Sequence, residues 1–239
     1  MSEALERKAS NAYYPLFMSL TGRVCLVVGG GPVGERKVKG LLRAGAAVRI
    51  AAPELTEWLQ TQCRAGAAEY VGDTFRHGLL DGVDLVFAAT SDPSLNHDIT
   101  EAAHGRRLWC NTATDPMEGS FVLPAVFRRG QLTVAVGTSG ASPAMASLIR
   151  DKLAEEFDDA WLMVLQMMAI LRGVIQSKGL DTGENQKLFR RLAKLPLVGW
   201  VRSQERDVAA EAVCGICHPH LSLDEMNRIW DETWKAFSS

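Results

Sequence analysis

A glycine-rich segment carries the clearest chemical signal in this sequence. Gly29, Gly31 and Gly34 satisfy the pattern G-x-G-x-x-G, after an apolar run and before a helical pattern. Glycines with this spacing let the chain turn tightly, so that backbone N–H groups at a helix N-terminus can approach a pyrophosphate. We therefore predict a dinucleotide site here. The alternative is a glycine-rich turn between a strand and a helix that holds no ligand.

An acidic residue follows at the distance at which the ribose of such a cofactor is usually bound. Glu54 lies 20 positions after Gly34 and directly after Pro53, and a carboxylate there can accept a hydrogen bond from the adenosine ribose. The alternative is that Glu54 belongs to the first turn of the next helix. Because Arg49 lies within the preceding apolar run and no arginine ends that run, the pattern favours NAD over NADP.

Thr90 and Asp115 are polar residues placed after later apolar runs. Small residues around Thr90 would leave room for a nicotinamide, and its hydroxyl could donate a hydrogen bond. The alternative is a strand end at which Ser91 or Asp92 caps the next helix. Asp115 is the nearest carboxylate after the last predicted strand and would serve as a general base if it were desolvated. Asp before Pro is also a common turn.

Two segments further along the chain have motifs with both a structural and a chemical interpretation. Ser142, before Pro143, is predicted to cap a helix whose free N–H groups could also bind a substrate carboxylate. Cys214, Cys217 and His218 match C-x-x-C-H, a spacing used for haem attachment. Such attachment normally requires export, and we predict no signal segment, so we interpret this motif as coincidence or a minor metal site. The five cysteines fit reduced thiols in a cytosolic protein.

The elements that must position these residues alternate between short apolar runs and helical patterns. This alternation predicts an α/β fold with a doubly wound parallel sheet and helices on both faces, and a ligand at the carboxyl ends of the strands. The predicted strands cover residues 24–28, 47–51, 68–71, 85–89 and 108–111, and the predicted helices cover 33–43, 54–64 and 93–104, with an ambiguous piece at 74–80.

After Pro116 the pattern changes. Residues 120–127 and 131–136 are predicted to form a hairpin or a small separate sheet, joined by 128–130. From Ser142 onward the apolar spacing is helical, with breaks near 179–183 and 196–199. These changes predict three parts, which cover residues 1–115, 116–141 and 142–239.

The composition excludes several classes of protein. The chain has 239 residues, a net charge of −2 and a pI near 6.2, so no overall positive field favours nucleic acid or anionic lipid as a partner. The stretch MSEALERKAS does not resemble a targeting segment, and we expect no apolar run near the roughly 18 residues that span a bilayer. We therefore expect a cytoplasmic protein.

Taken together, these motifs resemble the siroheme synthase N-terminal module, that is, precorrin-2 dehydrogenase/sirohydrochlorin ferrochelatase. The resemblance runs in family order over residues 13 to about 155. The stretches that carry it are YPLF, VVGGGPVGERK, APEL, FAATSDPSLN, CNTATDP with SFVLPA, and GTSGASPAMASLIRDKL.

The resemblance implies NAD-dependent oxidation of precorrin-2 to sirohydrochlorin, in some members followed by insertion of Fe²⁺ or Co²⁺. It also implies a Rossmann-like NAD-binding domain, a middle segment that builds a homodimer, and an all-helical C-terminal domain. By the family pattern, NAD contacts come from Pro32 and Val33 in the glycine loop and from Pro53 and Glu54 after the second strand. The serine of the family's G-x-S-P turn corresponds to Ser142, a candidate substrate residue. Asn111, at the end of the last predicted strand, is a further candidate substrate residue.

One position departs from the family pattern. The family usually has an aspartate, the proposed base, where this chain has Thr114, and Asp115 follows one residue later. Hydride transfer depends chiefly on positioning, whereas metal insertion must remove two pyrrole protons. We therefore expect dehydrogenase activity with weak or absent ferrochelatase activity, unless a rearranged loop lets Asp115 act as the base.

The substrate of this family carries many carboxylates, which basic side chains could bind. Candidates are Arg128, Arg129, Arg150 and Lys152, although solvated surface charge is the preferred interpretation of any single one. Thr114 also leaves open a non-enzymatic NAD- or tetrapyrrole-binding sensor or carrier. A second rival, the NAD-binding regulatory domain of a cation transport system, shares only the glycine loop and lacks the helix PAMASLIRDKL.

Overall fold

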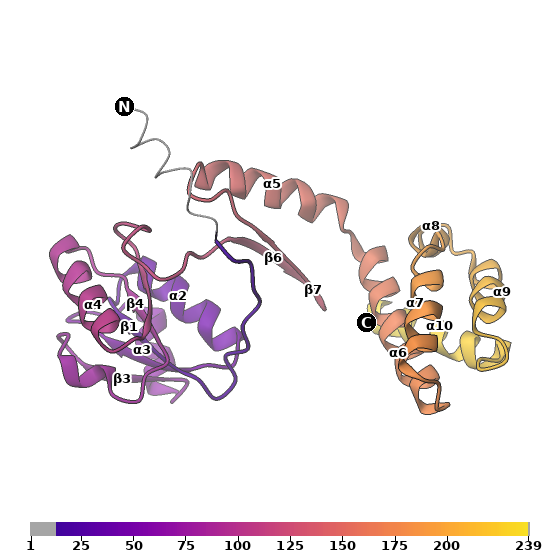
Figure 1. Cartoon of the computed structure of the whole chain (residues 1–239), viewed down its shortest axis with the longest axis horizontal. Coiled ribbons are helices and arrows are strands. Elements are labelled where there is room, and N and C mark those ends of the chain that lie inside the picture. Colours follow the sequence, from indigo (N-terminus) through magenta and orange to yellow (C-terminus); the bar gives the residue numbers. More distant parts are fainter. Residues whose placement is uncertain (1–12, 239) are drawn as a thin grey trace. The chain divides into compact units, whose positions relative to one another are not determined.

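A computed structural model describes residues 13–238, and it describes the side chains up to Lys235. The chain divides into two compact units (Figure 1), the first ending at Leu123 and the second beginning at Pro124. The N-terminal stretch MSEALERKAS, on which the expectation about targeting rests, lies outside the described residues. The division into three parts stays a prediction.

The first unit is built on a five-stranded parallel sheet in the order β3-β2-β1-β4-β5, which confirms the predicted fold class. Val28, at the end of β1, pairs with Ala51 of β2 and Ala88 of β4. These three strands therefore end at the same edge, where the glycine loop begins. The strands are β1 (Val24–Val28), β2 (Ala47–Ala51), β3 (Ala68–Gly72), β4 (Leu85–Ala88) and β5 (Trp109–Thr112).

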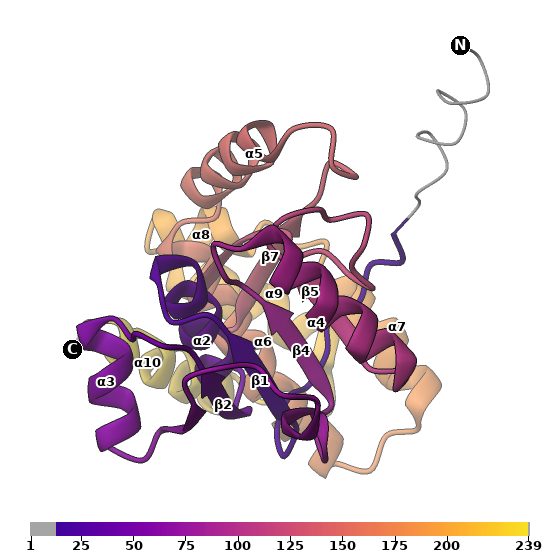
Figure 2. The same cartoon turned by 90° about the vertical axis from the view of Figure 1, so that its left-hand side faces the viewer.

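Helices cover both faces of this sheet because successive side chains of the apolar strands point to opposite sides. Val27 and Phe87 pack with residues of α2 and α3 in one buried cluster, whereas Leu26 and Val86 pack with Ile99 of α4 in another. Figure 2 shows α2 and α4 on either side of β1 and β4. The bounds are α2 (Pro32–Arg43), α3 (Glu57–Arg64) and α4 (Pro93–Gly105), with a 3₁₀ turn η1 at His77–Leu80.

The start of α3 differs from the prediction. The helix begins at Glu57 instead of residue 54, because Thr56 caps it and its Oγ1 accepts a hydrogen bond from the backbone N–H of Leu59 at 3.3 Å. Glu54 therefore lies in the loop that follows β2. The interpretation of Glu54 as a first-turn helix residue is wrong.

The second unit opens with an antiparallel hairpin of β6 (Ala125–Arg129) and β7 (Leu132–Val136). The prediction of a strand from residue 120 and a turn at 128–130 is wrong in both bounds. Ser120 is held by the first unit, where its backbone N–H donates to the carbonyl of Cys110 at 2.7 Å. The turn lies between Arg129 and Leu132, at the end of the predicted linker 128–130, and its Gly130 has a φ of 53°.

Helices make up the rest of the second unit, as predicted. The interhelix breaks fall before Thr182 and before Leu197, slightly earlier than expected. Figure 1 shows α5 running along the hairpin. The helices are α5 (Pro143–Glu156), α6 (Asp159–Ser177), α7 (Thr182–Leu192), α8 (Leu197–Arg202), α9 (Arg206–Cys217) and α10 (Leu223–Ser238).

Helix α6 corrects the expectation about apolar runs. Its 19 residues are long and apolar enough to cross a membrane by length and composition. The buried side chains of α6 include Met167, Leu171 and Ile175, which belong to the core shared with α9 and α10. These core contacts involve only part of the helix, since 39% of its most apolar window is buried.

Candidate functional site

Three glycines, two in the loop after β1 and one in the first turn of α2, are required by the fold itself. A Cβ on Gly29 would lie 2.3 Å from the carbonyl oxygen of Ala89, and one on Gly34 would lie 2.0 Å from the carbonyl oxygen of Gly29. A Cβ on Gly30 would lie 2.1 Å from the carbonyl oxygen of Glu54. The loop is thus packed directly against the backbone that follows β2 and β4. Gly30 was not among the glycines that the motif selected.

Gly31 differs from its neighbours because a Cβ there would meet no atom within 4 Å. Gly31 is the N-cap of α2 with a φ of −80°, and no side chain caps that helix. Pro32 follows, and Val33 is exposed. The first N–H groups of a helix have no intrahelical partner and attract anions. The open space at Gly31 and the uncapped helix start therefore fit a pyrophosphate.

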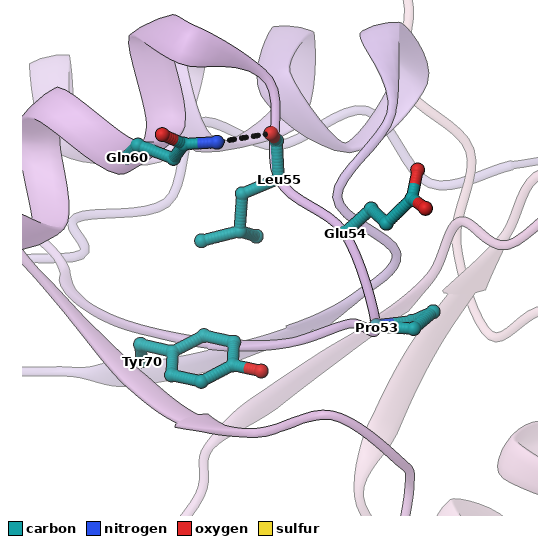
Figure 3. Close-up of a pocket in the computed structure, with 5 residues that line it drawn as sticks. All are labelled: Pro53, Glu54, Leu55, Gln60 and Tyr70. Atoms are coloured by element: carbon teal, nitrogen blue, oxygen red, sulfur yellow. Dashed lines mark hydrogen bonds between the residues drawn. The ribbon is translucent and has the colours of Figure 1, made fainter.

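A shallow cavity of about 420 Å³ lies beside the end of β2. In Figure 3 the ring of Tyr70 faces Leu55 across this cavity, and the carboxylate of Glu54 points away from the ring. The Tyr70 hydroxyl donates to the carbonyl of Ala52 at 3.0 Å, which fixes the ring. Pro53, Glu54 and Gln60 complete the lining. The predicted ribose ligand Glu54 thus stands exposed at the rim of a cavity next to the glycine loop.

A hydrogen-bonded cluster holds the loop after β2 against α2. Thr56 Oγ1 donates to Glu35 Oε2 at 2.5 Å, and the backbone N–H of Thr56 donates to the carbonyl of Gly30 at 3.0 Å. Glu35 also binds Lys39, whose ammonium lies 4.7 Å from the centre of the Trp58 ring. Hydrogen bonds from Lys39 and then Thr56 lower the pKa of the Glu35 carboxyl. Glu35 is therefore ionised at neutral pH and fixes the loop after β2 against α2.

Asn96 connects the loops that follow β4 and β5. Its side chain is 1% exposed and lies in the first turn of α4. Oδ1 accepts from the backbone N–H of Thr90 at 3.1 Å and from its Oγ1 at 2.9 Å. Nδ2 donates to the carbonyl of Thr90 at 3.1 Å and to Oγ1 of Thr114 at 2.7 Å. Thr90 and Thr114, predicted from separate segments, are thereby brought together.

The acidic residues near these loops have structural partners. Oδ1 of Asp92 accepts from the backbone N–H groups of Ser94 and Leu95, which confirms that Asp92 caps α4. Oδ1 of Asp115 accepts from the backbone N–H of Met117 at 2.9 Å, which confirms the predicted Asp-Pro turn. Asp115 is exposed, so its carboxylate lacks the desolvation that the interpretation as a base requires.

Lys37 and Asn111 form a second polar pair, under the opposite face of the sheet. Lys37 Nζ donates to Asn111 Oδ1 at 2.5 Å and lies 5.6 Å from the centre of the Phe87 ring. Asn111 is 5% exposed, and its Nδ2 donates to the carbonyl of Phe121 at 3.0 Å. Burial, aided by the charge of Arg36, lowers the pKa of Lys37 to about 8. Both ends of the Asn111 amide are thus engaged inside the protein.

The remaining predicted substrate residues lie in the second unit. Ser142 Oγ accepts from the backbone N–H of Met145 at 3.2 Å, which confirms that Ser142 caps α5. Arg128 and Lys152 are exposed. Arg150 binds its neighbour Asp151 at 2.7 Å. Their contact with substrate stays a prediction.

The C-x-x-C-H motif lies at the end of α9. Cys217 is buried and Cys214 is half-buried, and both are free thiols. Burial raises the pKa of Cys217 to about 11, which makes it a poor metal ligand at neutral pH. Among residues 13–238, no group of three or more His, Cys, Asp or Glu side chains is arranged to hold a metal ion.

Sequence reasoning missed the residues that hold the loops in place. Glu35, Lys37 and Asn96 sit at helical positions that pattern analysis assigns to a solvated face, and their partners lie far away in the chain. Only for Gly30 was a local signal present, namely three consecutive glycines after a strand.

Two family models match this chain. One, described as "Putative NAD(P)-binding", matches residues 16–125. The other, described as "Sirohaem biosynthesis protein central", matches residues 129–156.

Curated relatives extend this similarity. The siroheme synthase of Xylella fastidiosa (strain M12) is 37% identical over 221 residues, which are 92% of this chain and 46% of that protein. The siroheme synthase of Escherichia coli (strain K12 / DH10B) is 37% identical over 184 residues, which are 75% of this chain and 39% of that protein. The chain therefore spans less than half the length of these relatives.

A solved structure shares the fold. The protein described as SirC, precorrin-2 dehydrogenase, has a TM-score of 0.66 and 24% sequence identity, and the match covers 93% of this chain and all of that one. The shared fold consists of the parallel sheet with its helices, the strand pair and the helical region.

Proposed function

The chain belongs to the family of the siroheme synthase N-terminal module, and on that premise we propose that it oxidises precorrin-2 to sirohydrochlorin with NAD⁺. The observation that carries the proposal is the uncapped start of α2 at Gly31, beside the exposed carboxylate of Glu54. One site for a pyrophosphate and one for a ribose hydroxyl thus lie next to each other at the carboxyl edge of the sheet.

The residues that would hold NAD⁺ come from two loops. Gly31, Pro32 and Val33 surround the pyrophosphate position, and Pro53 with Glu54 lies at the adenosine end. A carboxylate at this place binds a ribose hydroxyl and repels a 2′-phosphate. Arg49 is turned elsewhere, since it binds Glu69 at 3.2 Å. This charge arrangement supports NAD over NADP.

The chain's own contribution to the oxidation is positioning. NAD⁺ held by these loops would supply the hydride acceptor, and the second hydrogen of the substrate would leave as a proton to water without a fixed base. The loops after β4 and β5, joined by Asn96, present Thr90 and Thr114 at the same edge as the glycine loop. Holding the reacting carbon against a nicotinamide is the contribution that these loops would make.

Metal insertion makes a different demand, because two pyrrole protons must be removed. Thr114 carries no carboxylate, and that of Asp115 is exposed and accepts a hydrogen bond within its turn. We therefore propose a dehydrogenase whose chelatase activity is weak or absent.

Anaerobic turnover tests these proposals. Freshly made precorrin-2 is mixed with NAD⁺ and sirohydrochlorin absorbance is followed, and Fe²⁺ or Co²⁺ is added once oxidation is complete. We expect oxidation, and metal insertion no faster than in a protein-free control. Accelerated insertion would identify a bifunctional enzyme. NAD⁺ binding without oxidation would instead support a sensor or carrier.

We also propose that the chain forms a homodimer through its hairpin and α5. Val126 on β6, and Met145, Leu148 and Ile149 on α5, are exposed apolar side chains within one compact unit. Burying such a patch against a second copy would remove it from water. The siroheme central-domain model matches this segment. Sedimentation at micromolar concentration measures the stoichiometry, and Leu148→Glu is expected to give monomers.

We propose a cytoplasmic location, which the proposed chemistry and the thiols support. All five cysteines are free, and Cys25 and Cys110 are buried in the sheet. Reduced, buried thiols are typical of proteins kept in a reducing compartment. Cell fractionation with an antibody against the chain tests this location.

A further inference from the structure

Asn96 fixes the direction in which the Thr114 hydroxyl can form hydrogen bonds. The two hydrogens of Asn96 Nδ2 are donated to the carbonyl of Thr90 and to Oγ1 of Thr114. The carbonyl of Thr90 can only accept and the backbone N–H of Thr90 can only donate, so a flipped amide would set its oxygen against the carbonyl and its NH₂ group against the N–H. Asn96 therefore approaches Thr114 as a donor, and the Thr114 oxygen acts as acceptor in that bond.

The hydrogen of the Thr114 hydroxyl is consequently directed away from Asn96. Thr114 is exposed, whereas Asn96 is buried, so the outward hydrogen is accessible to a ligand. A hydroxyl in this state is a donor toward an anionic oxygen. An aspartate at the same place would also accept from Asn96, but it would present an acceptor to the ligand.

The position of this donor relative to the cofactor loop is set by the backbone. The N–H of Ala113 donates to the carbonyl of Ala88 at 2.9 Å, which joins the ends of β4 and β5. Ala89, the next residue after β4, is packed against Gly29 of the glycine loop. The outward hydroxyl thus stands at the edge where the substrate must meet the nicotinamide.

Building on the proposed function, we propose that Thr114 donates a hydrogen bond to a carboxylate of the tetrapyrrole substrate, and that Asn96 is the positioning residue that orients it. The exchange of an acidic side chain for a threonine turns this position from a proton acceptor into a site for an anionic oxygen. Substrate binding therefore depends on the hydroxyl, and NAD⁺ binding does not.

Steady-state kinetics with precorrin-2 at saturating NAD⁺ test the assignment. Thr114→Val keeps the shape and removes the donor, so KM is expected to rise about tenfold, with kcat within about twofold. Thr114→Ser, which restores a hydroxyl, is expected to recover most of this loss. Thr61→Val, on the exposed surface of α3, is the matched control with unchanged KM.

A substitution at Asn96 distinguishes a loss of the Thr114 hydroxyl's orientation from a loss of packing around residue 96. In Asn96→Asp the ionised carboxylate can only accept, so it turns the Thr114 hydrogen inward and KM rises as in Thr114→Val. Protonation of that aspartate at lower pH restores a donor and lowers KM again, a pH dependence that lost packing would not produce. The NAD⁺ dissociation constant, from fluorescence titration, stays within about twofold in the Thr114 variants.

Two results overturn the inference. An unchanged KM in Thr114→Val, in a wild-type enzyme that oxidises precorrin-2, rejects the carboxylate contact and leaves the proposed function standing. A wild-type protein that neither oxidises precorrin-2 nor binds sirohydrochlorin in an absorbance titration rejects both.

Discussion

Gly31→Ala tests whether Gly31 is needed for cofactor binding, because a Cβ on Gly31 meets no protein atom, whereas a Cβ on Gly29, Gly30 or Gly34 would collide with the backbone. The backbone of Gly31, with φ −80° and ψ −172°, is open to any residue, and its Cβ would meet no protein atom within 4 Å. Gly31→Ala therefore folds, and it loses only the slight preference of an N-cap for glycine over alanine, about 0.5–1 kcal/mol. A methyl group there occupies the space in front of the uncapped helix start.

The expected cost falls on cofactor binding. If the methyl group prevents one charge-assisted hydrogen bond from the helix start to the pyrophosphate, binding weakens by about 2–3 kcal/mol. That is roughly 30- to 150-fold in the dissociation constant. Isothermal titration with NAD⁺ measures the affinity, and thermal unfolding without NAD⁺ measures the effect on stability.

Two further glycine variants complete the experiment. Gly40→Ala, also in α2 and in open space, is the matched control, with unchanged NAD⁺ affinity and about 0.5–1 kcal/mol of added stability. Gly34→Ala places a Cβ 2.0 Å from a carbonyl oxygen and is expected to unfold the protein. A folded Gly31→Ala that binds NAD⁺ within threefold of the wild type would refute this placement of the pyrophosphate.

Three other perturbations test the remaining polar groups. Thr114→Asp supplies a carboxylate and is expected to accelerate Co²⁺ insertion into sirohydrochlorin by about 100-fold, the lower range of general base catalysis; a rate equal to the wild type's contradicts it. Glu35→Gln and Thr56→Val each weaken NAD⁺ binding about threefold to tenfold, and the double variant adds nothing; additive effects would mean that the pair does not act as a unit. Lys37 has a folded pKa of about 8, below its usual 10.5, so the folded state releases this proton first and stability rises with pH from about 8 to 10.5. Relative to Lys37→Met, the free energy of unfolding in urea should therefore increase by about 1 kcal/mol between pH 7 and 9; a pH-independent difference would exclude a buried charge.

The sequence by itself determined the elements and their order in the first unit. Strands inside a parallel sheet are largely apolar, and Val24–Val28 and Ala47–Ala51 have the predicted bounds. Caps act over a few residues, so Ser142 was predicted correctly as a helix cap, and Asp92 was one of the two caps predicted for α4. The glycine motif correctly predicted a turn between a strand and a helix for the same reason, since β1, the turn and α2 are neighbours in the chain.

Tertiary structure decided which polar groups meet. Asn96 contacts Thr114 across 18 positions and Lys37 contacts Asn111 across 74, and neither separation leaves a periodic signal in the sequence. The same holds for the unit boundary at Leu123, because Ser120 is retained by a hydrogen bond to β5 instead of joining the hairpin. Contacts of this kind depend on how strands are ordered in the sheet, so they arise only when the whole unit is assembled.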